Sequence, residues 1–340
     1  MSSSATSSSH PLTALIVGCG QIAGGFDERA ESPGDAVLTH AGAYSRHPEF
    51  MIAACVEPDT ARRQAFMDYW GVPVGFSTLE GCLRTGMAFD VVSVCAPTPL
   101  HGSLLEKLLT APVRAVFCEK PLTDDLERSR YWVREYEESG KLLAVNYLRR
   151  WTPGITALRD ELASGAWGGV ISAMGSYVKG LLNNGSHLVD LLHYLLGPSL
   201  PVAALESRHD FFPKDPTVDA VLRLEQGGLA YLVGGDARAF TLFELTLIME
   251  KGRIVVENSG RSIRRQRVGE DPQFAGYRIL EPGEIEETGL GQAMPLAVEN
   301  LRAALREKAP LASTGRTALE AQEVCAHLLR LWEQSRSDAA

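Results

Sequence analysis

The sequence predicts an α/β protein with two domains. A parallel sheet with crossover helices is expected to precede an α+β domain with an open, mostly antiparallel sheet. The 340 residues exceed what one ordinary core needs, since a typical domain has ~150 residues. The hydrophobic pattern also changes near Trp151, from short apolar runs between amphipathic helical segments to longer runs with a period of two. We therefore expect a disordered tail over residues 1–10, a first domain over residues 11–148 and a second domain over residues 149–340.

In the first domain, short apolar runs alternate with helical segments, which is typical of a parallel sheet covered by helices. The expected strands span residues 12–17, 51–56, 91–95, 113–118 and 142–146. Thr98 and Pro99 begin a helix as N-cap and first-turn proline, and Gly140 ends the helix before the last strand. The order of these elements predicts a doubly wound sheet.

The second domain is expected to begin with a helix over residues 155–164 and to continue as strands with one covered face. These strands span residues 218–224, 230–233, 243–250, 254–257 and 263–268. A last helix is expected to start at a capping box formed by Thr317 and Glu320.

The composition argues against several partners. A formal net charge of −9 disfavours nucleic acid and anionic membranes, because both need a clustered excess of Lys and Arg. The six cysteines have neither CxxC nor metal-ligand spacing, which indicates a reduced protein without a metal. The start MSSSATSSSH has no signal-peptide pattern, and no apolar run approaches the ~18 residues of a membrane span. We expect a cytoplasmic protein with no membrane partner.

The segment VGCGQIAG after the first strand can hold a dinucleotide pyrophosphate. Gly18 permits a tight turn, Gly20 lets the backbone approach the phosphates, and Gln21 and Ile22 begin the following helix. Glu57 ends the second strand, where a carboxylate accepts hydrogen bonds from the adenosine ribose and repels a 2′-phosphate. NAD is therefore favoured over NADP. The unusual distance from Gly18 to Glu57 is attributed to an inserted loop over residues 25–37.

The segment CEKP predicts the other end of the same cofactor. Lys120 would stand at the end of a later strand of the sheet, where a nicotinamide lies, and Glu119 beside it is suited to the nicotinamide ribose. Arg62 and Arg63, near Glu57, are expected to lie solvated on a helix.

The chain resembles the Gfo/Idh/MocA oxidoreductases, which include relatives of glucose–fructose oxidoreductase and inositol dehydrogenase. The resemblance covers about residues 12 to 335. The matching segments, in order, are GCGQIA, VEPD, SVCAPTPLH, CEKPLT, NYLRRWTP, LASGAWGGVISA and NGSHLVDLLHYLLG. It implies a Rossmann domain followed by an open antiparallel sheet that commonly serves as an oligomer interface.

The resemblance also implies catalytic residues. Lys120 matches the lysine of the family's Glu-Lys-Pro motif, and His187 matches the histidine of its Asp-x-x-x-His pair, whereas Asn183 stands where the family has aspartate. Removing a hydroxyl proton as hydride leaves needs a base that titrates near neutrality, and His187 fits that role. Lys120 would polarise the carbonyl and bind the alkoxide. An amide at Asn183 can orient the imidazole but adds little to its charge. The alternative for Lys120 and for His187 is a structural role.

Further candidates come from the matching segments. Ala96, Pro97 and His101 are candidate cofactor contacts, although a capping or packing role for His101 is an alternative. Candidate substrate contacts are Tyr147, Arg150, Lys179, Asn184 and Asp190, with Arg149 as the solvated alternative to Arg150 and a plain helix-face carboxylate as the alternative for Asp190. The remaining histidines are expected to be surface or packing residues, namely His40, His47, His209 and His327, with His193 in the core.

The leading hypothesis is an NAD(H)-dependent oxidoreductase that acts on a secondary hydroxyl or keto group. Its substrate would be a sugar, a sugar derivative such as a nucleotide-linked sugar, or a cyclitol, and the protein would form a homodimer or homotetramer through the second sheet. Two alternatives keep the cofactor. One is glycoside cleavage with transient use of NAD, and the other is a dinucleotide-sensing regulator. Lys120 and His187 argue against the sensor, and Asn183 gives the alternatives their weight.

Overall fold

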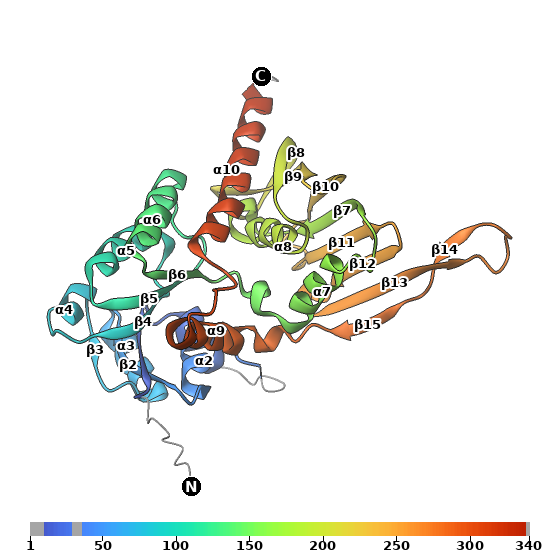
Figure 1. Ribbon diagram of the computed structural model, residues 1–340. Coiled ribbons are helices and arrows are strands. Elements are labelled where there is room, and N and C mark those ends of the chain that lie inside the picture. The colour runs from blue at the N-terminus through green and yellow to red at the C-terminus, as the bar shows by residue number, and fades with distance from the viewer. Residues whose placement is uncertain (1–9, 29–35, 338–340) are drawn as a thin grey trace, which may run out of the picture. The chain divides into compact units, whose positions relative to one another are not determined.

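The computed structural model describes residues 10–28 and 36–337, which form two compact units (Figure 1). The first unit contains the chain up to Asp124 together with Arg128–Asn146 and Met294–Thr314. The second contains Asp125–Glu127, Tyr147–Ala293 and the chain from Gly315 onward. The expected tail lies outside the described residues except for His10, and so does most of the expected inserted loop.

The first unit contains a six-stranded parallel sheet in the order β3-β2-β1-β4-β5-β6, as expected for a doubly wound domain. The strands are β1 (Leu12–Val17), β2 (Phe50–Val56), β3 (Gly75–Phe76), β4 (Phe89–Val94), β5 (Val113–Cys118) and β6 (Leu142–Val145). Their side chains are almost all buried, because helices cover both faces of a parallel sheet. The predicted fold class is confirmed. The sequence missed β3, whose two residues are too few to make a pattern.

Three helices of this unit begin where the sequence supplies an N-cap. The helix over His101–Thr110 begins without a side-chain cap, so Thr98 is not the N-cap that sequence analysis expected. The helices of this unit are α1 (Phe26–Glu28), α2 (His40–Arg46), α3 (Thr60–Trp70), α4 (Leu79–Leu83), α5 (His101–Thr110) and α6 (Leu126–Ser139). Thr39, Asp59 and Thr78 each accept a backbone N–H in the first turn of α2, α3 and α4. In Figure 1, α5 and α6 lie on one side of the sheet, and α2 and α9 (Ala293–Glu307) lie on the other.

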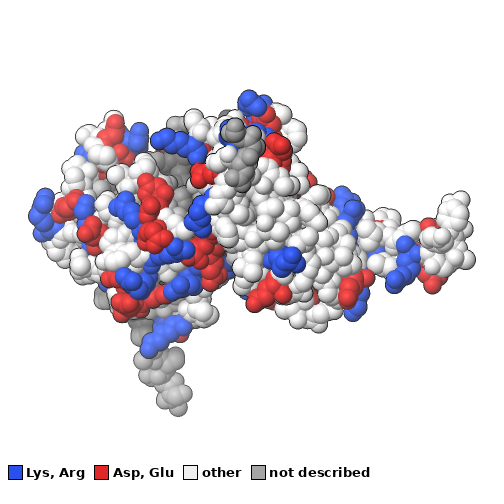
Figure 2. Space-filling model, turned by 90° about the horizontal axis from the view of Figure 1, so that it is seen from above, with Lys and Arg blue, Asp and Glu red and all other residues white. Residues whose placement is uncertain are grey.

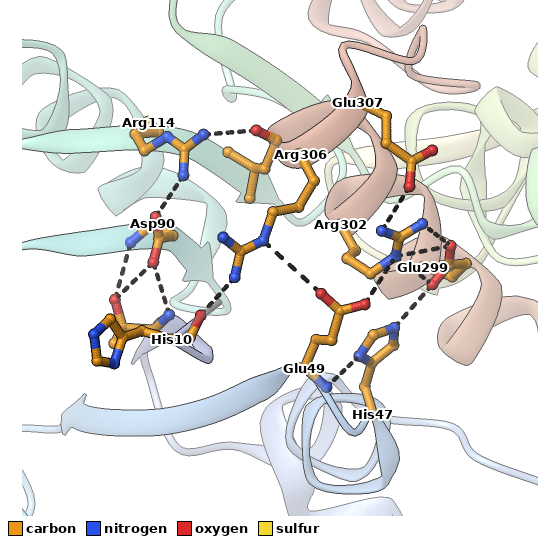
Figure 3. A network of polar contacts seen from close by, with 11 residues as sticks. His10, His47, Glu49, Asp90, Arg114, Glu299, Arg302, Arg306 and Glu307 are labelled. Atoms are coloured by element: carbon orange, nitrogen blue, oxygen red, sulfur yellow. Dashed lines mark hydrogen bonds and ion pairs between the residues drawn. The ribbon is translucent and has the colours of Figure 1, made fainter. Parts of the chain in front are cut away.

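Helix α9 corrects the expected domain boundaries, since sequence analysis placed it in the second domain. Its buried residues Ala297, Val298 and Leu301 form an apolar face, and polar contacts fasten its other side to the first unit (Figure 3). Glu299 lies 2.9 Å from His47 Nε2 and 2.7 Å from Arg302 Nη2. The amphipathic pattern predicts such a helix but does not say which sheet it covers.

The second unit contains a nine-stranded sheet in the order β14-β13-β12-β11-β7-β10-β9-β8, with β15 paired to β13. Its strands are β7 (Val170–Tyr177), β8 (Ser199–Phe212), β9 (Asp215–Leu224), β10 (Leu229–Gly234), β11 (Phe243–Met249), β12 (Gly252–Glu257), β13 (Ser262–Glu270), β14 (Arg278–Leu280) and β15 (Glu284–Glu287). All pairs are antiparallel except β7 with β10. Strands β7 and β8 were not predicted, because their apolar alternation is broken by small and polar residues.

One face of this sheet is covered by helices. They are α7 (Pro153–Ala163), α8 (Ser186–Leu196) and α10 (Gly315–Ser337), of which α8 packs closely on β7 because Gly175 leaves room for Leu188. The predicted alternation in β11 is confirmed, since Phe243, Leu245, Leu247 and Met249 are buried. Helix α10 begins two residues before Thr317, so this residue is not the N-cap that sequence analysis expected.

The opposite face is open and carries exposed apolar side chains. Met174 of β7 pairs with Tyr231 of β10, which pairs with Val221 of β9, so these residues form one row across the sheet. Strands β13, β14 and β15 extend from the rest of the sheet as an arm (Figure 1).

On the side of the molecule shown in Figure 2, acidic and basic side chains are interspersed. Among the described residues, no helix is long and apolar enough to cross a membrane.

Candidate functional site

The glycine turn lies at the carboxyl edge of the first sheet, directly after β1. Gly18 has φ +90°, and a Cβ there would stand 2.8 Å from backbone atoms of Cys95 and Ala96, so only glycine fits between the ends of β1 and β4. Gly20 instead faces open space, with no atom within 4 Å of the position that a Cβ would take. A π-helical turn over Gln21–Gly25 follows. The backbone here can be approached closely by a phosphate.

Glu57 fastens the end of β2 to this turn. Its Oε2 accepts a hydrogen bond from Cys19 N at 3.0 Å, and its Oε1 accepts one from Asp59 N at 3.1 Å. Arg63 Nη1 donates to the Glu57 carbonyl at 2.5 Å, and Arg62 Nη1 lies 3.7 Å from Glu57 Oε1. Arg63 is therefore not simply solvated, which corrects the expectation from sequence, whereas Arg62 is mostly exposed as expected.

Glu119 and Lys120 follow β5 at the same edge. Glu119 Oε1 lies 3.0 Å from His40 Nε2 and accepts a hydrogen bond from Asn146 Nδ2 at 2.7 Å. Burial raises the pKa of Glu119, but these hydrogen bonds and the charge of Lys120 outweigh it and hold the pKa below its usual value. Glu119 is therefore a carboxylate at neutral pH. Sequence analysis expected His40 to be a surface or packing residue. It is completely buried, as a packing residue would be, and its ring nitrogens are also within hydrogen-bond distance of Ser93 and Glu119.

His101 connects two backbone segments of this edge. Its Nδ1 lies 3.0 Å from the Pro121 carbonyl, and its Nε2 lies 2.8 Å from the Ala96 carbonyl. Both ring nitrogens are thus engaged with main chain, and the ring is 1% exposed. This geometry favours the positioning of Ala96 and Pro97 over a direct contact of His101 with a cofactor.

The residues of this edge fit a dinucleotide. The open space at Gly20 would take the pyrophosphate, and Asn146 Oδ1 is a buried acceptor without a partner among the described residues. Predicted cofactor residues stand at the ends of β1, β2, β4 and β5, which the parallel topology brings to one edge. The first unit therefore has the features of a dinucleotide-binding domain.

The second unit brings the predicted substrate residues into two groups. In the first group, the rings of Tyr147 and His187 lie edge to face with centroids 5.2 Å apart. Arg150 Nε lies 2.8 Å from Asp190 Oδ1 and 3.0 Å from Oδ2, which makes a buried ion pair. Burial raises the pKa of Asp190 to about 6, against the opposing charge of Arg150. Sequence analysis expected Arg149 to be solvated, but its guanidinium lies 3.5 Å from the centroid of the Phe243 ring.

The second group is the turn over residues 179–185, which leads into α8 and His187. Asp215 Oδ1 and Oδ2 each accept a backbone N–H at 2.8 Å, from Leu182 and from Asn183 respectively. Lys179, at φ +69°, donates its backbone N–H to Asp210 at 2.9 Å. Asn184 lies half-buried in the same turn. Asp210 and Asp215 were missed, because nothing in the sequence pairs the β8–β9 hairpin with this turn.

Asn183 has a local reason to be an amide. Its Nδ2 donates a hydrogen bond to the Lys179 carbonyl at 3.0 Å and closes the turn. An ionised aspartate has no hydrogen to donate and would repel that oxygen. The departure from the family pattern is therefore compatible with a turn-forming role for this side chain. Among the residues described, no group of three or more His, Cys, Asp or Glu side chains is placed to hold a metal ion.

Comparison with known proteins agrees with this geometry. Residues 12–147 match the family model described as "Oxidoreductase family, NAD-binding Rossmann fold". Inositol 2-dehydrogenase from Rhizobium meliloti is 30% identical over 131 residues, which are 38% of each chain. Myo-inositol dehydrogenase Hyg17 from Streptomyces leeuwenhoekii is 26% identical over 302 residues, which are 78% of this chain and 82% of the relative.

Solved structures share the fold over both units. The WlbA dehydrogenase from Bordetella pertussis, in complex with NADH and UDP-GlcNAcA, is 19% identical with a TM-score of 0.78, and 96% of each chain is covered. Residues 12–147 of this chain match the NAD-binding Rossmann domain of the Gfo/Idh/MocA oxidoreductase family. The predicted family and cofactor are thereby confirmed. The chain spans only 38% and 58% of the lengths of two of its curated relatives, inositol 2-dehydrogenase from Rhizobium meliloti and D-apiose dehydrogenase from Paraburkholderia graminis.

Proposed function

We propose that the protein is an NAD(H)-dependent oxidoreductase that acts on a secondary hydroxyl or keto group of a sugar, a sugar derivative or a cyclitol. The observation that carries this proposal is Lys120 at the carboxyl edge of the NAD-binding sheet, beside the ionised Glu119. Relatives named inositol 2-dehydrogenase and D-glucoside 3-dehydrogenase support the substrate class. NAD is preferred over NADP, because the Glu57 carboxylate would repel a 2′-phosphate.

The nicotinamide supplies or accepts the hydride when it is bound. Gly20 and the following turn would hold the pyrophosphate, Glu57 the adenosine ribose, and Glu119 the nicotinamide ribose. Lys120 stabilises the negative charge that develops on the substrate oxygen, and His187 removes or returns the hydroxyl proton. Tyr147 packs against the His187 ring and limits its orientation.

The remaining predicted residues receive positioning and binding roles. Asn183 shapes the turn before His187 through its hydrogen bond to Lys179. Lys179 and Asn184 would contact substrate hydroxyl or anionic groups from that turn, and the Arg150–Asp190 pair would support the wall next to Tyr147. Outside the site, we propose a cytoplasmic homodimer or homotetramer that associates through the open face of the second sheet.

The test is NADH formation across a panel of sugars, uronates, inositols and nucleotide sugars, followed by absorbance, with the reverse reaction on keto-sugars. We expect turnover with at least one substrate, and a loss of at least about a thousandfold in kcat for Lys120→Ala, because that variant removes the charge that stabilises the alkoxide. NADH affinity should change little by comparison. Lys107→Ala, on the surface of α5, is the control and should retain full turnover.

Three results would contradict the proposal. Full turnover in Lys120→Ala would remove Lys120 from the mechanism. Release of a sugar without accumulation of NADH would favour glycoside cleavage, and tight NAD binding without any turnover would favour a dinucleotide sensor.

A further inference from the structure

A buried chain of hydrogen bonds runs from α2 to the edge that carries Lys120. Tyr44 OH lies 3.0 Å from Ser93 Oγ, which lies 3.0 Å from His40 Nδ1, and His40 Nε2 lies 3.0 Å from Glu119 Oε1. Tyr44, Ser93 and His40 are all 0% exposed. The chain thus connects α2 and β4 to the end of β5, and only Glu119 at its end is partly exposed.

One arrangement of hydrogens satisfies every member of this chain. Glu119 as a carboxylate only accepts, so His40 Nε2 donates to it, and His40 Nδ1 then accepts from Ser93, which accepts from Tyr44. Burial raises the pKa of Tyr44, so the far end of the chain retains its proton. The chain can therefore orient the Glu119 carboxylate.

His40 is held in place by its own helix start. Asp27 accepts hydrogen bonds from Thr39 N at 3.1 Å and Thr39 Oγ1 at 2.6 Å, and Thr39 caps α2, whose first residue is His40. On its other side, the His40 ring packs on Phe117 of β5 with centroids 4.5 Å apart. The imidazole is therefore fixed before any ligand binds.

We propose that His40 is a positioning residue of the cofactor site, which holds the Glu119 carboxylate in place beside Lys120 where the nicotinamide end of the dinucleotide binds. This inference rests on the proposed function, because it assigns Glu119 to the nicotinamide ribose. It adds a residue from α2, about eighty positions earlier in the chain, to the groups that prepare this end of the site.

Few groups besides His40 favour the ionised form of Glu119. The hydrogen bond from Asn146 and the charge of Lys120 do so, and burial opposes them. The thiols of Cys95 and Cys118 also face Glu119. The pKa of each thiol is raised, mainly by the burial of the thiol and also by the negative charge of Glu119. Without the His40 N–H, burial should be less well compensated, and the pKa of Glu119 should rise.

The experiment measures NADH affinity by calorimetry across the neutral pH range. Wild type should show little dependence on pH. His40→Phe, which keeps a ring against Phe117, should bind about tenfold more weakly on the acid side and recover as pH rises, because protonated Glu119 is a poorer acceptor for a ribose hydroxyl. His40→Gln, which keeps an N–H donor, should lie between the two. His47→Phe is the matched control, since His47 pairs with Glu299 at 2.9 Å, and it should bind like wild type.

Infrared spectroscopy gives a second readout that needs neither substrate nor cofactor. In His40→Phe, a protonated carboxyl band should persist to higher pH than in wild type, and adding Glu119→Gln should remove this band. Wild-type affinity and pH dependence in folded His40→Phe would overturn the proposal. If that variant does not fold, Glu119→Gln decides: weakened, pH-independent binding supports the proposal, and wild-type binding overturns it. Failure of the proposed function would appear instead as absent turnover with these binding results intact.

Discussion

At the residue scale, the second unit prepares its site with carboxylates that sit behind the residues expected to meet substrate. Asp215 receives two backbone N–H groups from the turn before α8, and Asp210 receives one hydrogen bond from Lys179 and one from Thr217. These hydrogen bonds hold the backbone of Asn183 and set where α8 begins. The position of His187 therefore depends on residues that make no contact with the reacting atoms.

Asp215→Ala tests this dependence. It removes the acceptor of two partly buried N–H groups, and we expect a loss of about 2 kcal/mol in the free energy of unfolding. We also expect at least about a tenfold lower kcat, while NADH affinity stays at the wild-type value. Urea denaturation and steady-state kinetics are the measurements. Asp236→Ala is the control, because Asp236 pairs with Arg238 in its own turn. A wild-type kcat in folded Asp215→Ala would show that the turn does not need this anchor.

At the element scale, α9 is joined to the first unit by an apolar face and by a set of charged contacts (Figure 3). Arg302 contacts Glu299, Glu307 at 2.8 Å and Glu49 at 3.6 Å, and Arg114 donates to the Leu305 carbonyl at 2.6 Å. The hydrogen bonds from Arg302 lower the pKa of Glu299 to about 2, with a smaller contribution from His47. Because the pKa of Glu299 is lower in the folded than in the unfolded state, Glu299 stabilises the fold at pH values at which it is ionised in both states.

The stabilisation by Glu299 should therefore be complete above pH 4.5 and be lost as pH falls toward about 2. We expect Glu299→Gln to lower the free energy of unfolding by less than about 1 kcal/mol at neutral pH, since the side chain is nearly half exposed. The difference from wild type should shrink over the acid range. Urea titrations at several pH values measure it. The exposed Glu106→Gln serves as control, and a difference that does not depend on pH would contradict the role of the ionised carboxylate.

At the scale of the whole molecule, the open face of the second sheet is the surface that best fits association with a second copy. Met174 and Tyr231 are paired across β7 and β10 and are 47% and 43% exposed. Further exposed apolar residues lie on the arm, including Phe274, Tyr277 and Ile285. Exposed apolar side chains gathered on one sheet face are typical of interfaces.

Sedimentation velocity tests the predicted oligomer. Wild type should sediment as a dimer or tetramer, and Tyr231→Asp should shift the distribution toward a smaller species, because it places a charge in the apolar row. Tyr131→Asp, at a comparably exposed tyrosine of α6, should not. A monomeric wild type, or an unchanged Tyr231→Asp, would exclude this face as the interface.

Local patterns were sufficient for much of the first unit. Apolar runs marked five of its six strands, and Gly18 could be assigned to a tight turn because the glycine motif directly follows the first strand. The alternation of β11 predicted its covered face for the same reason, since each depends on neighbours in the chain. These features follow from the order of residues alone.

Long-range packing accounts for the rest, because the partners are far apart in the chain. It assigned α9 to the first unit, placed His40 against Glu119, and set Asp215 beneath the turn that carries Asn183. The local sequence around a histidine, an aspartate or an amphipathic helix does not identify the residue or sheet that it contacts, since burial and hydrogen bonding are properties of the assembled fold. The order of residues was enough to specify the cofactor domain and its family, whereas the folded chain selected which side chains hold the site in place.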